Sequence, residues 1–340
     1  MLLCLKKKLL CLKEKDNMYL EEFLAEWHSG SPTVLVHTSG STGKPKPMYV
    51  EKRRMEASAR ITCQFLGLKQ GDTALLCMSL DYIAGKMMVV RAQTWGLRLL
   101  SVAPSGHPLS AVTEPVDFAA MVPMQVYNTL QVPEERERLM AVRHLIIGGG
   151  AIDDALAREL AGFPNHVWST YGMTETLSHI ALRRLNGAEA SDWYTPFEGV
   201  SLSQTDEGCL VIDAPAVHDG PLVTNDIVEL SDKGFRILGR KDNVICSGGI
   251  KIQTEEVERM LKPHLPAPFM ITKRPDRKFG EQVVLLTEST DMDRVREICQ
   301  QVLPKFWQPR SYAHIDALPM TETGKPARKE AEGYALNIKD

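Results

Sequence analysis

The chain has 340 residues, 44% hydrophobic and 24% charged, which is long enough for two globular domains with a sizeable core. Its formal net charge of -3 supplies no basic field for a phosphate backbone, which argues against nucleic acid as a partner. The seven cysteines include no C-x-x-C pair, which argues against a zinc or dithiol site and favours reduced thiols in a cytoplasmic protein.

Residues 1–17 lack the pattern of a packed element. Their apolar stretches are short and interrupted by lysines, no small-residue cleavage site follows, and they cannot span a bilayer. We therefore expect no stable membrane insertion. We favour an untranslated or disordered leader before Met18 over a targeting or membrane-surface segment. After it, MYLEEFLAEW predicts an amphipathic helix whose apolar residues are Leu20, Phe23, Leu24 and Trp27.

The first two-thirds of the chain alternates strand and helix patterns. Strands are predicted at 34–39, 73–78, 99–103, 117–122 and 144–147, and helices at 54–65 and 82–95. This order predicts a largely parallel sheet covered by helices. After Glu198, short strands separated by the turn signals D-E-G and D-K-G predict a β-rich subdomain.

The remainder predicts a second, smaller α+β domain. It has a helix at 254–261 with Thr254 as N-cap, strands at 269–272 and 283–287, and a helix at 291–302. The expected fold class is therefore α/β, with an N-terminal domain at 1–240 and a C-terminal domain at 241–340. We expect the link between them near 239–242.

The loop after the first predicted strand has the composition of a phosphate cradle. Glycines let backbone N–H groups approach phosphate oxygens, while hydroxyls and lysines add donors and positive charge. A flexible surface loop is the alternative. The spacing is not that of a P-loop NTPase, because Thr38 stands where the first glycine belongs and Pro45 follows the lysine. The candidate phosphate-binding residues are Thr38, Ser39, Gly40, Ser41, Thr42, Gly43, Lys44 and Lys46.

The stretch TSGSTGKPK resembles the signature loop of the adenylate-forming superfamily, which includes acyl-CoA synthetases, luciferases and peptide-synthetase adenylation domains. Six further segments resemble the family's motifs, in the family's order, between this loop and Arg328. Each of them alone is an ordinary turn or surface segment. Together they imply that the chain forms an acyl-AMP intermediate and that its C-terminal domain is mobile.

Two of these segments resemble the walls of the family's adenine site. In Tyr171-Gly172-Met173-Thr174-Glu175 the resemblance places Tyr171 along adenine, Thr174 at the α-phosphate and Glu175 on Mg²⁺, a metal that prefers oxygen ligands. The second segment, which would pack on the other side of adenine, is Gly149-Gly150-Ala151.

The ribose and hinge motifs follow. Asp226 matches the acid that binds both ribose hydroxyls, although Asn225 stands where the family usually has glycine. Gly239-Arg240-Lys241-Asp242 resembles the inter-domain hinge, with Arg240 on the ribose side and Asp242 as the pivot.

The last two motifs lie in the C-terminal domain. Gly248, Gly249 and Lys251 belong to a loop that resembles the lining of the pantetheine tunnel in CoA-using members. Lys325 lies in a segment that resembles the terminal motif, whose lysine bridges the acyl carboxylate and the α-phosphate.

The implied reaction needs cations because the carboxylic acid and the triphosphate are both anionic. Mg²⁺ at Glu175 and the ammonium of Lys325 would supply positive charge at the α-phosphoryl group. The implied cofactors and co-substrates are ATP, Mg²⁺ and coenzyme A. The expected catalytic residues are Lys325, Thr174 and Glu175.

The chain most resembles compact 2-succinylbenzoate:CoA ligases of menaquinone biosynthesis. Three features carry this resemblance: the short region before the signature loop and the segments YGMTETLSHIALRR and GRKDNVICSGGIKIQ. A substrate with a second carboxylate implies a cation or several donors in the acyl pocket. The candidates are Ser178, His179 and Arg183, for which surface or core packing is the alternative.

Other functions stay open. A general acyl- or aryl-CoA ligase and a carrier-protein-loading enzyme would share the ATP site, and free-CoA dependence would separate the second of these. A non-catalytic nucleotide sensor would have lost Lys325 or Glu175, and both are present. The sequence leaves the oligomeric state undetermined.

Overall fold

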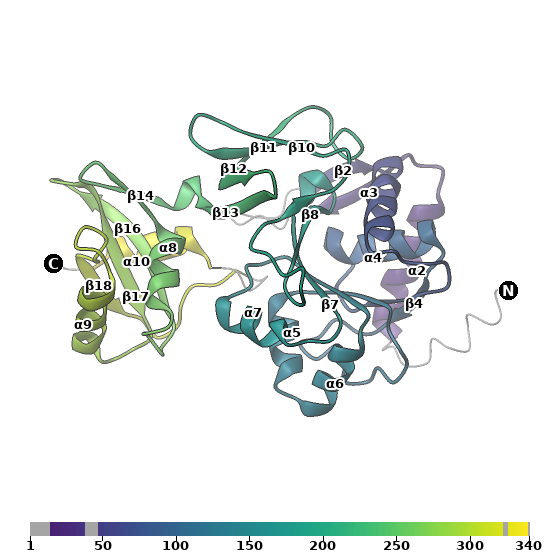
Figure 1. Cartoon of the computed structure of the whole chain (residues 1–340), viewed down its shortest axis with the longest axis horizontal. Helices are drawn as coiled ribbons and strands as arrows, with labels where there is room; N and C mark the ends of the chain where they lie inside the picture. Colours follow the sequence, from purple (N-terminus) through teal and green to yellow (C-terminus); the bar gives the residue numbers. More distant parts are fainter. Residues whose placement is uncertain (1–13, 38–46, 322–325, 339–340) are drawn as a thin grey trace.

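The computed structural model describes the backbone of residues 14–37, 47–321 and 326–338. The predicted phosphate loop at 38–46 and Lys325 lie outside these ranges. A smaller body, made of the strands β14 to β18 and the helices α8 to α10, lies beside a larger body that contains the preceding elements (Figure 1).

The larger body is built on a mixed sheet. Within the described ranges, seven strands pair in the order β4-β3-β5-β6-β7-β8-β9. Pairs from β4 to β7 are parallel, and β8 and β9 are added antiparallel. The prediction of an α/β fold with a largely parallel sheet is confirmed. The strands are β3 (Thr73–Leu76), β4 (Arg98–Ser101), β5 (Phe118–Met121), β6 (His144–Ile147), β7 (His166–Gly172), β8 (His179–Arg184) and β9 (Thr195–Pro196).

Helices accompany this sheet. The two predicted helices are found at α3 (Lys52–Phe65) and α4 (Ile83–Trp95), and the N-terminal amphipathic helix is α2 (Glu14–His28), with Leu20, Phe23 and Trp27 buried. Three short helices were not predicted because fewer than three turns give little periodic signal. They are α5 (Pro123–Leu130), α6 (Pro133–Ala141) and α7 (Asp154–Ala161).

A β-rich unit follows, as the sequence predicted. In the described chain it consists of four antiparallel strands in sequence order. The turn signal D-E-G joins the first strand to the second, and D-K-G joins the third to the fourth. The strands are β10 (Ser201–Gln204), β11 (Cys209–Asp213), β12 (Leu222–Ser231) and β13 (Gly234–Arg240). β13 continues through Arg240, so the first irregular link is the 3-10 helix η2 (Lys241–Asn243). A separate hairpin, β1 (Thr33–His37) and β2 (Pro47–Glu51), flanks the loop at 38–46.

The smaller body has its own sheet, in the order β15-β14-β17-β16, with β18 parallel to β17, and its own apolar core around Ile252 and Leu285. One detail of the sequence prediction was wrong: Gln253 is the N-cap of α8, and the Thr254 hydroxyl instead donates to the Asn243 carbonyl in η2. The elements are β14 (Val244–Ser247), β15 (Ile250–Gln253), α8 (Thr254–Leu261), β16 (Phe269–Asp276), β17 (Gly280–Thr287), α9 (Met292–Val302), β18 (Ser311–His314) and α10 (Arg328–Leu336).

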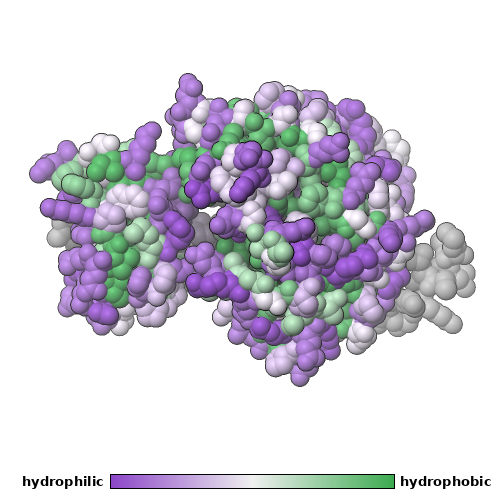
Figure 2. Space-filling view, viewed as in Figure 1, coloured by the Kyte–Doolittle hydropathy of each residue, from purple (hydrophilic) through white to green (hydrophobic). Residues whose placement is uncertain are grey.

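Hydrophilic side chains are spread over both bodies on the face that Figure 2 shows. Among the helices that the structure describes, none has the length and apolar character needed to cross a membrane.

Two histidines stack at the amino edge of the main sheet. His144 on β6 and His166 on β7 are register partners, with ring centroids 4.9 Å apart and planes tilted by 14°. Burial, with a smaller effect from the charges of His166, Arg143 and Arg184, lowers the pKa of His144 to about 4.

This depressed pKa predicts acid sensitivity. The unfolded chain binds a proton at His144 near pH 6.5 and the folded chain does not, so stability is complete above pH 6.5 and falls toward pH 4. His144→Phe keeps the ring and removes the titration. We expect it to reduce the loss of unfolding free energy between pH 7 and pH 5 by about 1 kcal/mol, a value discounted for the partial exposure of the ring. Urea unfolding at both pH values measures this, with His28→Asn at an exposed helix end as control; parallel losses in wild type and His144→Phe would contradict it.

Candidate active site

Two predicted motifs meet at the carboxyl edge of the main sheet. β6 and β7 are adjacent parallel strands, so the segments that follow them leave the sheet side by side. Gly149, Gly150 and Ala151 follow β6, and Tyr171 and Gly172 end β7. Ligand sites in parallel α/β sheets lie at this edge, so the arrangement fits the sequence prediction of a nucleotide site.

Two predicted residues donate hydrogen bonds to the carboxylate of a third, Asp226. The Tyr171 hydroxyl donates to Asp226 Oδ2 at 2.7 Å, and Arg240 Nη1 donates to Asp226 Oδ1 at 2.8 Å. Burial, followed by the charge of Asp226, raises the pKa of Tyr171 far above its ordinary value, so the phenol remains a donor. The structure thus joins β7, β12 and β13 through residues that the sequence placed at the adenine and the ribose.

The predicted pivot belongs to the same network. Asp242 Oδ2 accepts from Arg240 Nη2 at 3.3 Å and from Asn225 Nδ2 at 3.1 Å. Asn225, which stands where the family usually has glycine, therefore contacts the link between the two bodies. The chain is connected by hydrogen bonds from Tyr171 in the sheet to Asp242 in η2.

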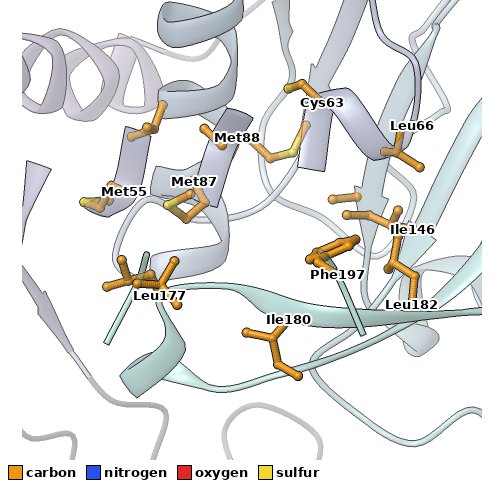
Figure 3. Packing of buried hydrophobic residues seen from close by; sticks show 14 of the residues in the cluster. Met55, Cys63, Leu66, Met87, Met88, Ile146, Leu177, Ile180, Leu182 and Phe197 are labelled. Carbon is orange, nitrogen blue, oxygen red and sulfur yellow. The ribbon is translucent and has the colours of Figure 1, made fainter. Parts of the chain in front are cut away.

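The turn after β7 is tightly constrained. A Cβ on Gly172 would lie 2.2 Å from the carbonyl oxygen of Ser178, so no larger residue fits there. Leu177, with φ of 65°, is the one non-glycine residue with positive φ in the described part of the chain. Its side chain is buried in the cluster that contains Met55 and Met87, which stabilises this backbone conformation (Figure 3). The turn thereby fixes the positions of the two residues that follow it.

The 3-10 helix η1 (Thr174–Thr176) lies between Gly172 and Leu177. In it, Thr174 is buried and Glu175 is exposed. No group of three or more His, Cys, Asp or Glu side chains that could hold a metal ion occurs in the described ranges. A single exposed carboxylate fits Mg²⁺ only if nucleotide phosphates and water complete its coordination. Glu175 is exposed just beyond the carboxyl end of β7, at the edge where the predicted nucleotide motifs lie.

A buried polar cluster lies directly beyond this turn. Arg91 Nη2 on α4 donates to the Ser178 hydroxyl at 2.6 Å, and the Ser178 and His179 side chains are 3.2 Å apart (Oγ to Nδ1). His179 Nε2 lies 3.1 Å from Thr62 Oγ1 on α3, which Arg91 Nη2 also approaches at 3.4 Å. Two predicted acyl-site residues, Ser178 and His179, are therefore brought together with two residues that the sequence reasoning missed.

The cluster carries a positive charge without a counter-charge. Arg91 is 2% exposed, and burial lowers its pKa to about 10, so it stays protonated at neutral pH. No carboxylate acts on it among the described residues, and its Nε has no hydrogen-bond partner there. Burial also lowers the pKa of His179 well below its ordinary value, so the imidazole is neutral. The sequence signal for Arg91 was a lone arginine inside the apolar helix segment KMMVVRAQ.

Arg183, the third predicted acyl-site residue, is placed elsewhere. Its Nη1 lies 3.6 Å from Asp192 Oδ1, and its guanidinium lies over the Tyr194 ring. Neither Ser178 nor His179 contacts it in the hydrogen bonds and ion pairs of the described chain. In the described chain, Arg91 is therefore the arginine that contacts Ser178, and Arg183 lies beside Asp192.

In the smaller body, the predicted CoA loop is the turn of a tight hairpin. Gly248 and Gly249 have φ of 59° and 82° and connect β14 to β15, a turn that requires positive φ at both residues. Nothing lies within 4 Å of a Cβ added to Gly249, and Lys251 is exposed on β15. The loop is therefore open at Gly249, whereas a Cβ on Gly248 would lie 3.1 Å from the Phe279 ring.

Arg328, at the other end of the motif that contains Lys325, pairs with Glu258 on α8. Away from η2, an ion pair of 3.1 Å between Lys262 Nζ and Asp153 Oδ2 joins the two bodies. Asp153 is also the N-cap of α7, where its other oxygen accepts two backbone N–H groups. The ion pair links the smaller body to the helix that follows the predicted adenine segment.

Comparison with known proteins gives consistent matches. The family model of the AMP-binding enzymes matches residues 6–211. A 2-succinylbenzoate–CoA ligase of Bacillus cereus (strain AH820) is 26% identical, over 87% of this chain and 69% of that protein.

Two solved structures show similar folds. An acyl-CoA synthetase (AMP-forming)/AMP-acid ligase II-like protein from Dyadobacter fermentans is 32% identical, with a TM-score of 0.66 over 96% of this chain and 95% of that one. The o-succinylbenzoate CoA synthetase (MenE) from Bacillus subtilis, solved with ATP and magnesium ion, is 22% identical, with a TM-score of 0.71 over 87% and 69%. The chain belongs to the AMP-binding enzymes, the adenylate-forming family that the sequence motifs predicted, as a member of the acyl-CoA synthetase type.

Proposed function

We propose that this chain is a ligase that joins 2-succinylbenzoate to coenzyme A. In the first half-reaction a carboxylate oxygen of the acid attacks the α-phosphorus of ATP and pyrophosphate leaves, which gives the acyl-AMP. In the second, the CoA sulfur attacks the acyl carbon, the thiol proton is lost and AMP leaves. The resemblance to a ligase of this name at 26% identity supports the proposal.

The observation that carries the choice of acid is Arg91. Burying a guanidinium without a counter-charge is unfavourable, and a carboxylate supplied by the substrate would offset that cost. Arg91 also donates to Ser178, which lies three residues after the predicted nucleotide motif. A second carboxylate on the acyl group suits this position, whereas a fatty or aromatic acid with only the reacting carboxylate would leave the charge unpaired.

We assign the nucleotide to the carboxyl edge of the main sheet. Tyr171 would lie along one side of adenine and Gly149, Gly150 and Ala151 along the other, with the ribose hydroxyls on Asp226 and Arg240 beside them. The network that joins Tyr171, Asp226 and Arg240 supports this placement. When bound, Mg²⁺ would neutralise phosphate charge at Glu175, and Thr174 would contact the α-phosphate.

We propose that residues 1–240 and 241–340 act as two domains that reorient about Asp242. One arrangement would bring Lys325 to the α-phosphate, and the other would bring the hairpin turn with Gly248, Gly249 and Lys251 to the acyl-AMP. The separate cores of the two bodies and the short link between them support this assignment. The loop at 38–46 would bind the ATP phosphates.

The proposal is tested by ATP-dependent pyrophosphate release with a panel of carboxylic acids, with and without CoA. We expect 2-succinylbenzoate to be preferred over benzoate and medium-chain fatty acids, with AMP and the CoA thioester as products. A kcat/KM for a fatty acid comparable to that for 2-succinylbenzoate would contradict this choice of acid and would indicate a general acyl-CoA ligase. Turnover that needs a carrier protein in place of free CoA would indicate a carrier-loading enzyme.

A further inference from the structure

The hydrogen-bond directions in the buried cluster can be worked out from the valence of each group. The Thr62 hydroxyl has a single hydrogen, and it donates to the carbonyl of Ser58 one turn earlier on α3, at 3.1 Å. Thr62 Oγ1 must then accept from its other two neighbours, His179 Nε2 and Arg91 Nη2. His179 is neutral, so a proton on Nε2 leaves Nδ1 as an acceptor.

The same reasoning determines the hydrogen-bond directions at Ser178. Its hydroxyl accepts from Arg91 Nη2, and its hydrogen is free to donate to His179 Nδ1. Every donor in this ring then has an acceptor. With the other tautomer, Nδ1–H would point at Ser178 Oγ, which already accepts from Arg91, and the Ser178 hydrogen would have no acceptor among the described contacts. The ring therefore favours a single tautomer, with the proton on Nε2.

We propose that Thr62 and His179 are positioning residues that set the orientation of the Arg91 guanidinium for the second carboxylate of the acyl substrate. Both contacts of Nη2 go to oxygen atoms of the protein, Ser178 Oγ and Thr62 Oγ1. Within the described chain, Nε has no partner and Nη1 approaches only the weak acceptor Met88 Sδ, at 3.8 Å. These two nitrogens are the donors left for a carboxylate, and they stay in place only while the ring is intact.

This inference rests on the proposed function, because it assigns to Arg91 a contact with the substrate. It adds that discrimination depends on a hydroxyl that does not itself touch the acid. Thr62→Val removes the hydroxyl and keeps the shape of the side chain, whereas Thr62→Ser keeps the hydroxyl and serves as the matched control. Thr62→Ala replaces the valine variant if circular dichroism shows that valine perturbs the fold.

We expect Thr62→Val to raise KM for 2-succinylbenzoate about tenfold, with kcat of pyrophosphate release changed less than threefold and benzoate turnover unaffected. Thr62→Ser should stay within about twofold of wild type. Equal effects on 2-succinylbenzoate and benzoate would show that Thr62 only stabilises the fold and would overturn the proposal.

A second readout is independent of turnover. ¹⁵N chemical shifts of labelled histidine, assigned to His179 by loss of the signal in His179→Gln, report which ring nitrogen carries the proton. We expect the Nε2–H tautomer in wild type and Thr62→Ser, and a mixture in Thr62→Val. An Nδ1–H tautomer in wild type overturns the ring whatever the substrate is. Conversely, the expected tautomer in an enzyme that does not use 2-succinylbenzoate would reject the proposed acid and the role of the ring in binding it, and would leave the hydrogen-bond assignment standing.

Discussion

Replacing Arg91 with methionine is expected to lower kcat/KM for 2-succinylbenzoate by about 100-fold or more, because the second carboxylate loses its buried partner. Acids that lack this group should be used as well as before or better. The apolar helix around Arg91 accommodates methionine, and exchange of a buried charge for an apolar side chain of similar size is often neutral for stability. Melting temperature should therefore change little. Pyrophosphate release at varied acid concentration measures the effect.

Two further variants sharpen this result. Arg91→Lys keeps the charge but loses the planar donor pattern, so an intermediate loss is expected. Arg60→Met removes an exposed arginine from α3 and serves as a control. It should leave kcat/KM unchanged for both 2-succinylbenzoate and benzoate. A loss in Arg91→Met that is equal for 2-succinylbenzoate and benzoate would mean that Arg91 supports the fold rather than binding the acid.

The second large effect is expected at the link. Asp242→Pro fixes the φ of residue 242 and restricts Lys241, so the backbone no longer moves freely between two arrangements. Adenylation needs only the arrangement that brings Lys325 to the α-phosphate, whereas transfer to CoA needs a second arrangement. We expect acyl-AMP and pyrophosphate to form at near wild-type rates, while transfer of the acyl group to CoA slows by about 100-fold. Single-turnover measurement of each half-reaction separates the two steps.

Asp242→Ala is the control for this prediction. It removes the contacts with Arg240 and Asn225 but leaves the backbone free. Any effect of losing those contacts should therefore appear in both variants. The slow transfer to CoA should appear in the proline variant alone. If both half-reactions of a folded Asp242→Pro protein remain near wild type, or fall together, the pivot lies elsewhere.

The sequence by itself determined the family, the fold class and the position of several strands and helices. Motif spacing and strand patterns are local properties: β6 was predicted at its observed bounds, and α4 begins one residue after its predicted start. The segments around Tyr171, Asp226 and Arg240 were also identified before their contacts were known. The predicted N-cap of α8 was wrong. The Thr254 hydroxyl donates to the carbonyl of Asn243, which precedes the strand pair β14 and β15, and local propensity does not show this contact.

The tertiary structure decided which side chains meet. Arg91 lies 87 residues before Ser178 and Thr62 lies 117 residues before His179 in sequence, so no local pattern could join them. Arg183 has the right charge and follows the nucleotide motif, yet it pairs with Asp192 and stacks on Tyr194. Which arginine remains without a carboxylate depends on how α3 and α4 pack against β8, because burial and pairing are properties of the packed structure and not of the sequence alone.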